Sequence, residues 1–158
     1  MTIRYKKRIR LKDFNYIGCH RYFITLCTHG KEILFRDNPS LVEWLIEALR
    51  EKSKAFGFNV WAYCFLPDHL HLLIEGKDTR SDMRGFVSSF KQATSFLYKK
   101  KMGLRLWQIN FYDHVLRTEE NTMNVVYYIF SNPMRKGLVD NFEKYPFLGS
   151  FELDVTKM

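Results

Sequence analysis

The sequence is poor in cysteine and lacks any long apolar run, and both absences exclude classes of protein. Its 158 residues include three cysteines, at positions 19, 27 and 64, with no CxxC pair. This scattered odd set predicts neither a disulfide framework nor a structural zinc site, so we expect reduced thiols. No stretch reaches about 18 apolar residues, and no apolar run follows the basic N-terminus. We therefore expect no membrane span, no signal peptide and a cytoplasmic location.

Acidic residues are also in deficit, which points to a polyanionic partner. Lys and Arg number 25 against 17 Asp and Glu, for a net charge of +8. No linker or repeat divides the chain, so we expect one domain over 1–158, with a basic arm at 1–12 and a C-terminal tail at 140–158. The arm has no acid and could bind phosphates or simply be solvated. Its cations are Arg4, Lys6, Lys7, Arg8, Arg10 and Lys12.

The apolar periodicities predict alternating strands and helices. Alternation and β-branched residues predict strands, and apolar spacings of three and four predict helices, the last starting near Glu119 with Thr118 as its N-cap. This order predicts an α+β, ferredoxin-like (RRM-like) antiparallel sheet with helices on one face and an added C-terminal helix. The expected strands are 22–27, 59–66, 69–74 and 111–116, and the earlier helices are 40–55 and 82–101.

A pair of histidines one residue apart lies in one expected strand. Side chains alternate along a strand, so His69 and His71 should share one face while Leu70 and Leu72 face the core. Two imidazoles on one face make half of a metal site. The alternative is a hydrogen-bonded surface pair.

The last expected helix offers the other half. Met123, Val126, Tyr127 and Phe130 form an apolar stripe at helical spacing, so we expect Tyr127 to pack. Tyr128 should lie on another face, one turn below Asn132, and Pro133 should end or kink the helix there. Imidazoles and an amide oxygen can bind a divalent metal, and a phenol can attack phosphorus. Tyr128 could equally be an ordinary amphipathic side chain.

Four sequence blocks in this order resemble a known family. They are Leu66-Pro67-Asp68-His69-Leu70-His71-Leu72-Leu73; Tyr22 to Leu26; Trp107-Gln108 with Phe111-Tyr112-Asp113-His114 and Arg117; and Tyr128-Ile129-Phe130-Ser131-Asn132-Pro133 with Arg135, Gly137, Leu138 and Val139. The first is similar to the histidine–hydrophobe–histidine (HUH) motif of single-tyrosine transposases. Together they resemble the REP-associated tyrosine transposases, relatives of insertion-sequence-200-type enzymes.

The resemblance implies a metal-dependent single-strand DNA endonuclease and strand transferase. It makes Tyr128 the nucleophile that forms a 5′-phosphotyrosine, and His69, His71 and Asn132 the ligands of Mg²⁺ or Mn²⁺. It implies DNA hairpins of repetitive extragenic palindromes as the target, no nucleotide cofactor and a nucleoid location, with monomer or homodimer left open. At Asp68 the family often has asparagine. This carboxylate could assist the metal, even as the third ligand in place of Asn132, or cap the turn, and we expect it to cap the turn. His114 is expected to be structural.

DNA contacts are expected from the basic arm, from Arg117 and from Lys91, although a solvated helix face explains Lys91 equally well. The rival hypothesis is a ferredoxin-like module that binds single-stranded nucleic acid without catalysis. It keeps the charge and the exposed aromatics but needs neither Tyr128 nor a metal.

Overall fold

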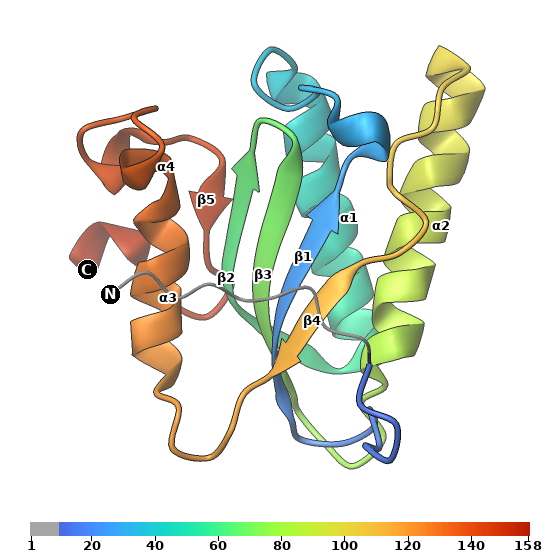
Figure 1. The fold of residues 1–158 in the computed structure, drawn as a ribbon, viewed down its shortest axis with the longest axis vertical. Helices are drawn as coiled ribbons and strands as arrows, with labels where there is room; N and C mark the ends of the chain where they lie inside the picture. The colour runs from blue at the N-terminus through green and yellow to red at the C-terminus, as the bar shows by residue number, and fades with distance from the viewer. Residues whose placement is uncertain (1–9) are drawn as a thin grey trace.

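A five-stranded antiparallel sheet in the order β4-β1-β3-β2-β5 organises the computed structural model, which describes residues 10–158 (Figure 1). The order of the first four strands is that of a ferredoxin-like sheet, and the predicted fold class is confirmed. The strands are β1 (Arg21–Cys27), β2 (Phe58–Leu66), β3 (His69–Gly76), β4 (Tyr112–Val115) and β5 (Leu148–Gly149). The helices are α1 (Pro39–Phe56), α2 (Met83–Met102), α3 (Thr122–Phe130) and α4 (Asn132–Arg135), with 3-10 turns at His29–Lys31, Phe142–Lys144 and Val155–Lys157.

The two faces of the sheet pack against different helices. Leu70, Leu72 and Ile74 of β3 are fully buried in the cluster that contains α1 and α2. Phe23 and Leu73 lie in a second cluster with α3, which stands on the opposite side of the sheet (Figure 1). Because strand side chains alternate, the histidine positions of β3 lie on the α3 face. No helix in the described part of the chain is long and apolar enough to cross a membrane.

A β-bulge in β2 changes which residues share a face. The sequence predicts Val60, Ala62, Cys64 and Leu66 on one side, but the register shifts between Val60 and Ala62. Val60 therefore packs with α1 and α2, and the other three face α3. That part of the prediction is wrong because the bulge places an extra residue, Trp61, between the two alternating runs.

The β2–β3 turn, which precedes the first histidine, is tied to the segment that follows β1. The carbonyl of Pro67 accepts a hydrogen bond from the Phe35 amide at 3.0 Å. The carbonyl of Asp68 accepts from the Thr28 amide at 3.0 Å and from its hydroxyl at 3.1 Å. These bonds satisfy the backbone of the turn and hold the start of β3 in place.

The segment that begins α3 differs from its prediction. The helix starts at Thr122, and the side chain of Asn121, rather than Thr118, caps it by accepting from the Asn124 amide at 3.1 Å. Glu120 stays outside the helix because its carboxylate accepts from the Arg117 amide and bonds His114. The contact with His114 on β4 overrides the preference of acidic residues for a first helical turn.

The C-terminal tail is part of the sheet. Residues 148 and 149 form β5, which pairs with Tyr63 and Cys64 of β2. The Phe65 amide donates to the Phe147 carbonyl at 2.8 Å, and the Tyr145 hydroxyl donates to the Phe65 carbonyl. The tail thus covers the edge of β2 that would otherwise offer unpaired backbone groups.

Gly76→Ala is expected to destabilise the fold strongly. A Cβ at Gly76 would lie 2.0 Å from the Gly18 carbonyl oxygen, and backbone must move to admit it. We expect a loss of about 2–4 kcal/mol in the free energy of unfolding, measured by urea denaturation. The matched control is Gly137→Ala. At Gly137 φ is 70°, and an added Cβ would meet no atom within 4 Å apart from its chain neighbours, so only backbone strain of about 1 kcal/mol applies. Equal losses in the two variants would contradict the clash.

Candidate active site

His69 and His71 lie side by side on the α3 face of β3, with ring centroids 4.7 Å apart. The Nδ1 atom of His71 is 2.9 Å from the Thr25 hydroxyl, and that of His69 is 2.6 Å from Asp68 Oδ1. Both Nδ1 atoms are thus engaged, which leaves the two Nε2 atoms as the ring nitrogens suited to bind a metal. Partners of this kind fix the orientation of metal-binding imidazoles.

Burial favours the neutral form of both imidazoles. It lowers the pKa of His69, although the neighbouring Asp68 carboxylate opposes this shift. It lowers the pKa of His71 well below the usual range, with His69, Lys136 and Arg135 adding to the effect. Neutral imidazole is the form that binds a metal, so the pair suits that role at neutral pH.

Asp68 does not cap the turn as expected. Its carboxylate accepts from His69 instead. When one ring nitrogen of a histidine binds a metal, a carboxylate that accepts a hydrogen bond from the other ring nitrogen makes the histidine a stronger ligand. Asp68 is therefore placed to assist the histidine pair.

Tyr128 projects from α3 towards the same side of the sheet. Its ring centroid is 6.1 Å from that of Phe23, which lies 5.2 Å from that of His71. Phe23 thus links the tyrosine and histidine rings across the helix–sheet interface. Tyr128 is half-buried, and the Arg135 guanidinium carbon lies 4.2 Å from its ring centroid.

Tyr127 is 48% exposed, so the expectation that it packs is wrong. The core-facing residues of α3 are Val125, Val126, Ile129 and Phe130. At 100° per residue, Tyr127 and Tyr128 lie on opposite flanks of that stripe. The tertiary contacts of β2 and β3, rather than the apolar character of the tyrosine ring, set which side of the helix is buried.

Asn132 lies one turn beyond Tyr128 and is 7% exposed. The predicted break is confirmed: α3 ends at Phe130, Ser131 follows, and Pro133 sits in the first turn of α4. In the described residues no three His, Cys, Asp or Glu side chains are grouped to hold a metal. The Asn132 amide oxygen is a ligand type outside that set.

The predicted DNA-binding residues that the structure describes come from separate parts of the fold. Arg4, Lys6, Lys7 and Arg8 lie outside the described residues. Arg10 stacks 3.9 Å from the Phe111 ring centroid, and its Nε lies 3.7 Å from a carboxylate oxygen of Asp113. Arg117 is exposed in the loop before α3, roughly 20 Å from His69 along the strands. Neither Arg10 nor Arg117, the two described here, makes a contact with the histidine pair.

Lys91 holds a loop. Its ammonium donates to the carbonyls of Gln108 at 2.7 Å and Ile109 at 2.8 Å. Burial, with a smaller effect from Arg10, lowers its pKa to about 8. The solvated helix face considered for Lys91 is therefore wrong, and a DNA contact would have to use its remaining N–H group.

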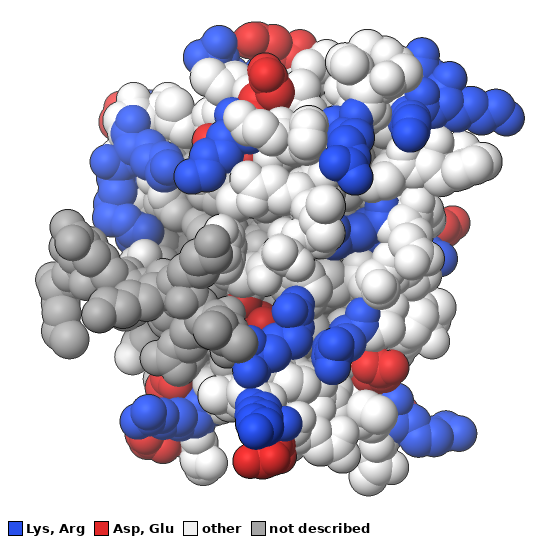
Figure 2. Space-filling view, turned by 45° about the vertical axis from the view of Figure 1, so that its right-hand side comes forward, with Lys and Arg blue, Asp and Glu red and all other residues white. Residues whose placement is uncertain are grey.

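Other cations gather at the end of α2. Lys99, Lys100 and Lys101 occupy its last turn, where Figure 2 shows a group of basic side chains. Cations there are also favoured by the helix dipole.

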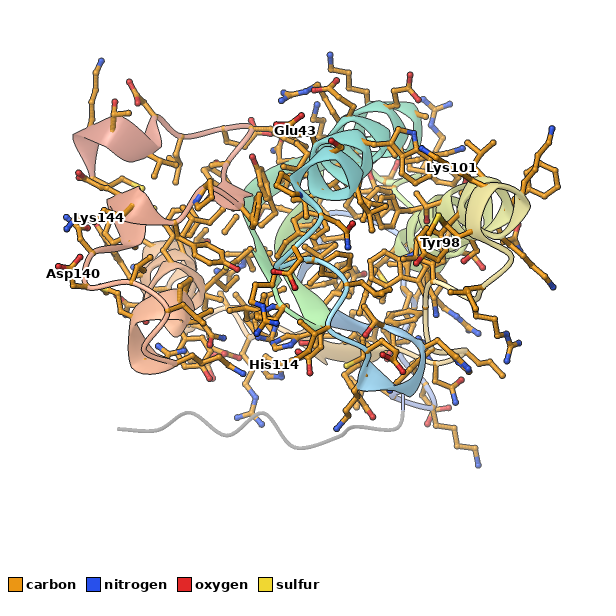
Figure 3. All side chains as sticks on the ribbon, turned by 90° about the horizontal axis from the view of Figure 1, so that it is seen from above. Glu43, Tyr98, Lys101, His114, Asp140 and Lys144 are labelled. Atoms are coloured by element: carbon orange, nitrogen blue, oxygen red, sulfur yellow. The ribbon has the colours of Figure 1, made fainter. Side chains whose placement is uncertain are left out.

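His114 comes from β4 and serves a structural contact (Figure 3). Its Nε2 lies 2.9 and 3.0 Å from the two carboxylate oxygens of Glu120. The pair ties β4 to the loop that leads into α3, the helix that carries Tyr128.

The sequence did not reveal that Thr25 and Arg135 orient these side chains, and for Asp68 it favoured the turn over the metal site. Thr25 faces His71 across the β1–β3 register. Arg135 follows Tyr128 by seven residues, close to two helical turns, and this spacing was the one available signal for its contact with the tyrosine ring.

Comparison with known proteins agrees with this architecture. The family described as "Transposase IS200 like" matches residues 17–132. A REP-associated tyrosine transposase of Escherichia coli (strain K12) is 30% identical over 145 residues, covering 89% of this chain and 80% of that protein. The solved structure of a REP-associated tyrosine transposase bound to a REP hairpin superposes with a TM-score of 0.73 at 22% identity, covering 94% of this chain and 87% of that one. The chain therefore belongs to the IS200-like transposase family, among the REP-associated tyrosine transposases.

Proposed function

We propose that this transposase is a metal-dependent single-strand DNA endonuclease and strand transferase that uses Tyr128 as its nucleophile. The observation that carries the proposal is the ring contact of Tyr128 with Phe23, which itself contacts His71. This places a phenol and two neutral imidazoles on one side of the sheet. Tyr127, on the other flank of α3, lacks that position.

The proposed reaction exchanges one phosphodiester for another. The Tyr128 oxygen bonds to phosphorus as the bond from phosphorus to the 3′-oxygen breaks. The phenolic proton passes to solvent, and the departing oxygen takes up a proton to give a free 3′-OH. The 5′-phosphate stays on the tyrosine until a 3′-OH attacks it and reseals the strand, so no nucleotide cofactor is needed.

The proposed ligands of Mg²⁺ or Mn²⁺ are His69 and His71 through Nε2, with the Asn132 amide oxygen as the third. When bound, the ion supplies Lewis-acid polarisation of a phosphodiester oxygen. Asp68 and Thr25 keep the two rings oriented through their Nδ1 atoms. The buried position of Asn132, one turn beyond the nucleophile, supports its assignment.

The proposed substrate is a DNA hairpin of the REP type, and we place the protein at the nucleoid. The support is the bound hairpin in the structural relative and the name of the Escherichia coli relative. The basic arm, with Arg10 at its described end, and Arg117 would contact phosphates. Lys91 would contribute less to DNA binding because two of its ammonium protons already bond the loop.

Chelation of the metal is expected to abolish covalent adduct formation while hairpin binding persists. The assay incubates the protein with a labelled palindromic single strand and Mn²⁺ or EDTA, then seeks a protein–DNA adduct that survives denaturant. We expect the adduct with Mn²⁺ alone. Salt-sensitive binding with no adduct under either condition would favour the non-catalytic binding module, and an adduct that resists EDTA would reject the metal dependence.

A further inference from the structure

Arg135 is joined to Tyr128 by two routes. Its guanidinium carbon lies 4.2 Å from the Tyr128 ring centroid. The same guanidinium donates to the Ser131 hydroxyl, which in turn donates to the Tyr128 carbonyl at 2.9 Å. The ring and the backbone of the tyrosine are thus both held by one cationic side chain.

The break between α3 and α4 produces this arrangement. Ser131 follows the last residue of α3, and Pro133 occupies the first turn of α4. The Arg135 amide then donates to the Ser131 carbonyl at 2.9 Å. This single turn brings the Arg135 side chain back over the last turns of α3. Arg135 is itself exposed, so it can reach a ligand from solvent.

The contacts of Tyr128 connect Arg135 with the histidine side of the sheet. Arg135 contacts the Tyr128 ring, and that ring reaches His71 through Phe23. A phosphodiester positioned for attack by Tyr128 would therefore lie within reach of the Arg135 guanidinium. The planar guanidinium has five N–H donors and matches the geometry of phosphate oxygens better than a lysine does.

We propose that Arg135 is a catalytic residue of the transposase: it orients the Tyr128 ring and donates a hydrogen bond to a non-bridging oxygen of the scissile phosphate. This inference rests on the proposed role of Tyr128. The donor would stabilise the charge that the phosphate gains as the phenolic oxygen attacks.

The test measures single-turnover adduct formation by Arg135→Ala and Arg135→Lys on a labelled hairpin with Mn²⁺. We expect the alanine variant to lose about 10²–10³-fold in rate constant, as when one transition-state donor is removed, with hairpin affinity changed only severalfold. The lysine variant should keep part of the rate because it retains the charge. Millimolar guanidinium should accelerate the alanine variant and leave the unmodified protein unaffected.

The matched control is Arg50→Ala. The Arg50 guanidinium carbon also lies 4.2 Å from an aromatic centroid, that of Phe151, but the contact is between α1 and the C-terminal segment. It should not change the rate. An unaltered rate in Arg135→Ala would overturn the inference, as would a slow variant that guanidinium does not rescue. If Tyr128→Phe still forms the adduct, the proposed function fails. If Tyr128→Phe forms no adduct but Arg135→Ala forms it at the normal rate, only the inference about Arg135 fails.

Discussion

Tyr128→Phe is expected to abolish the covalent protein–DNA adduct, whereas Tyr127→Phe should form it at the normal rate. The first change removes the proposed attacking oxygen from the side of α3 that contacts Phe23. Loss of a nucleophile commonly costs about 10⁴–10⁶-fold in rate. The adduct is measured by denaturing gel electrophoresis after incubation with a labelled hairpin and Mn²⁺.

Tyr127→Phe is a close control because it makes the same chemical change one residue away. Tyr127 is 48% exposed on the opposite flank of the helix. Hairpin affinity should stay within about twofold in both variants because each keeps its aromatic ring. Cleavage by Tyr128→Phe, or loss of cleavage in Tyr127→Phe alone, would show that the nucleophile is assigned to the wrong residue.

His71→Ala is expected to lower the rate of adduct formation by about 10³-fold or more and to weaken Mn²⁺ binding. The change removes one of two imidazoles whose centroids are 4.7 Å apart. The Lewis acid would then be held too weakly to polarise the phosphate, a contribution worth several kcal/mol. Calorimetric titration with Mn²⁺ checks the binding independently of activity.

Asp68→Asn should give a smaller loss, about 10–100-fold, because it weakens only the orientation of His69. The matched control for His71→Ala is His29→Ala. His29 is exposed, and its backbone amide, not its ring, makes the bond to Leu106. Unchanged Mn²⁺ affinity in His71→Ala would contradict the metal site.

The sequence predicted those features that depend on local alternation. The period of two in β3 correctly placed His69 and His71 opposite Leu70 and Leu72. Pro133 correctly marked the break after α3 because a proline restricts the residue before it. The proposed roles of Tyr128, the histidines and Asn132 stay predictions.

The features that escaped prediction depend on contacts between different structural elements. The bulge at β2 moves Val60 to the other face, and the pairing of Glu120 with His114 delays the start of α3. The exposure of Tyr127 follows from where β2 and β3 meet the helix. The pairing of β5 with β2 joins segments more than 80 residues apart. None of these contacts leaves a periodic signal in its own segment.

The second hydrophobic cluster also sets a distance. The histidines belong to the sheet and Tyr128 to a helix, so the thickness of the layer between them fixes the gap between the proposed nucleophile and the proposed metal ligands. Two of the buried side chains beneath α3, Ala62 and Cys64, are small. They let the helix come close to β2, and a bulkier residue at either place would lift Tyr128 away from the histidines. The apolar interior of this face therefore sets the spacing of the proposed active site without touching the DNA.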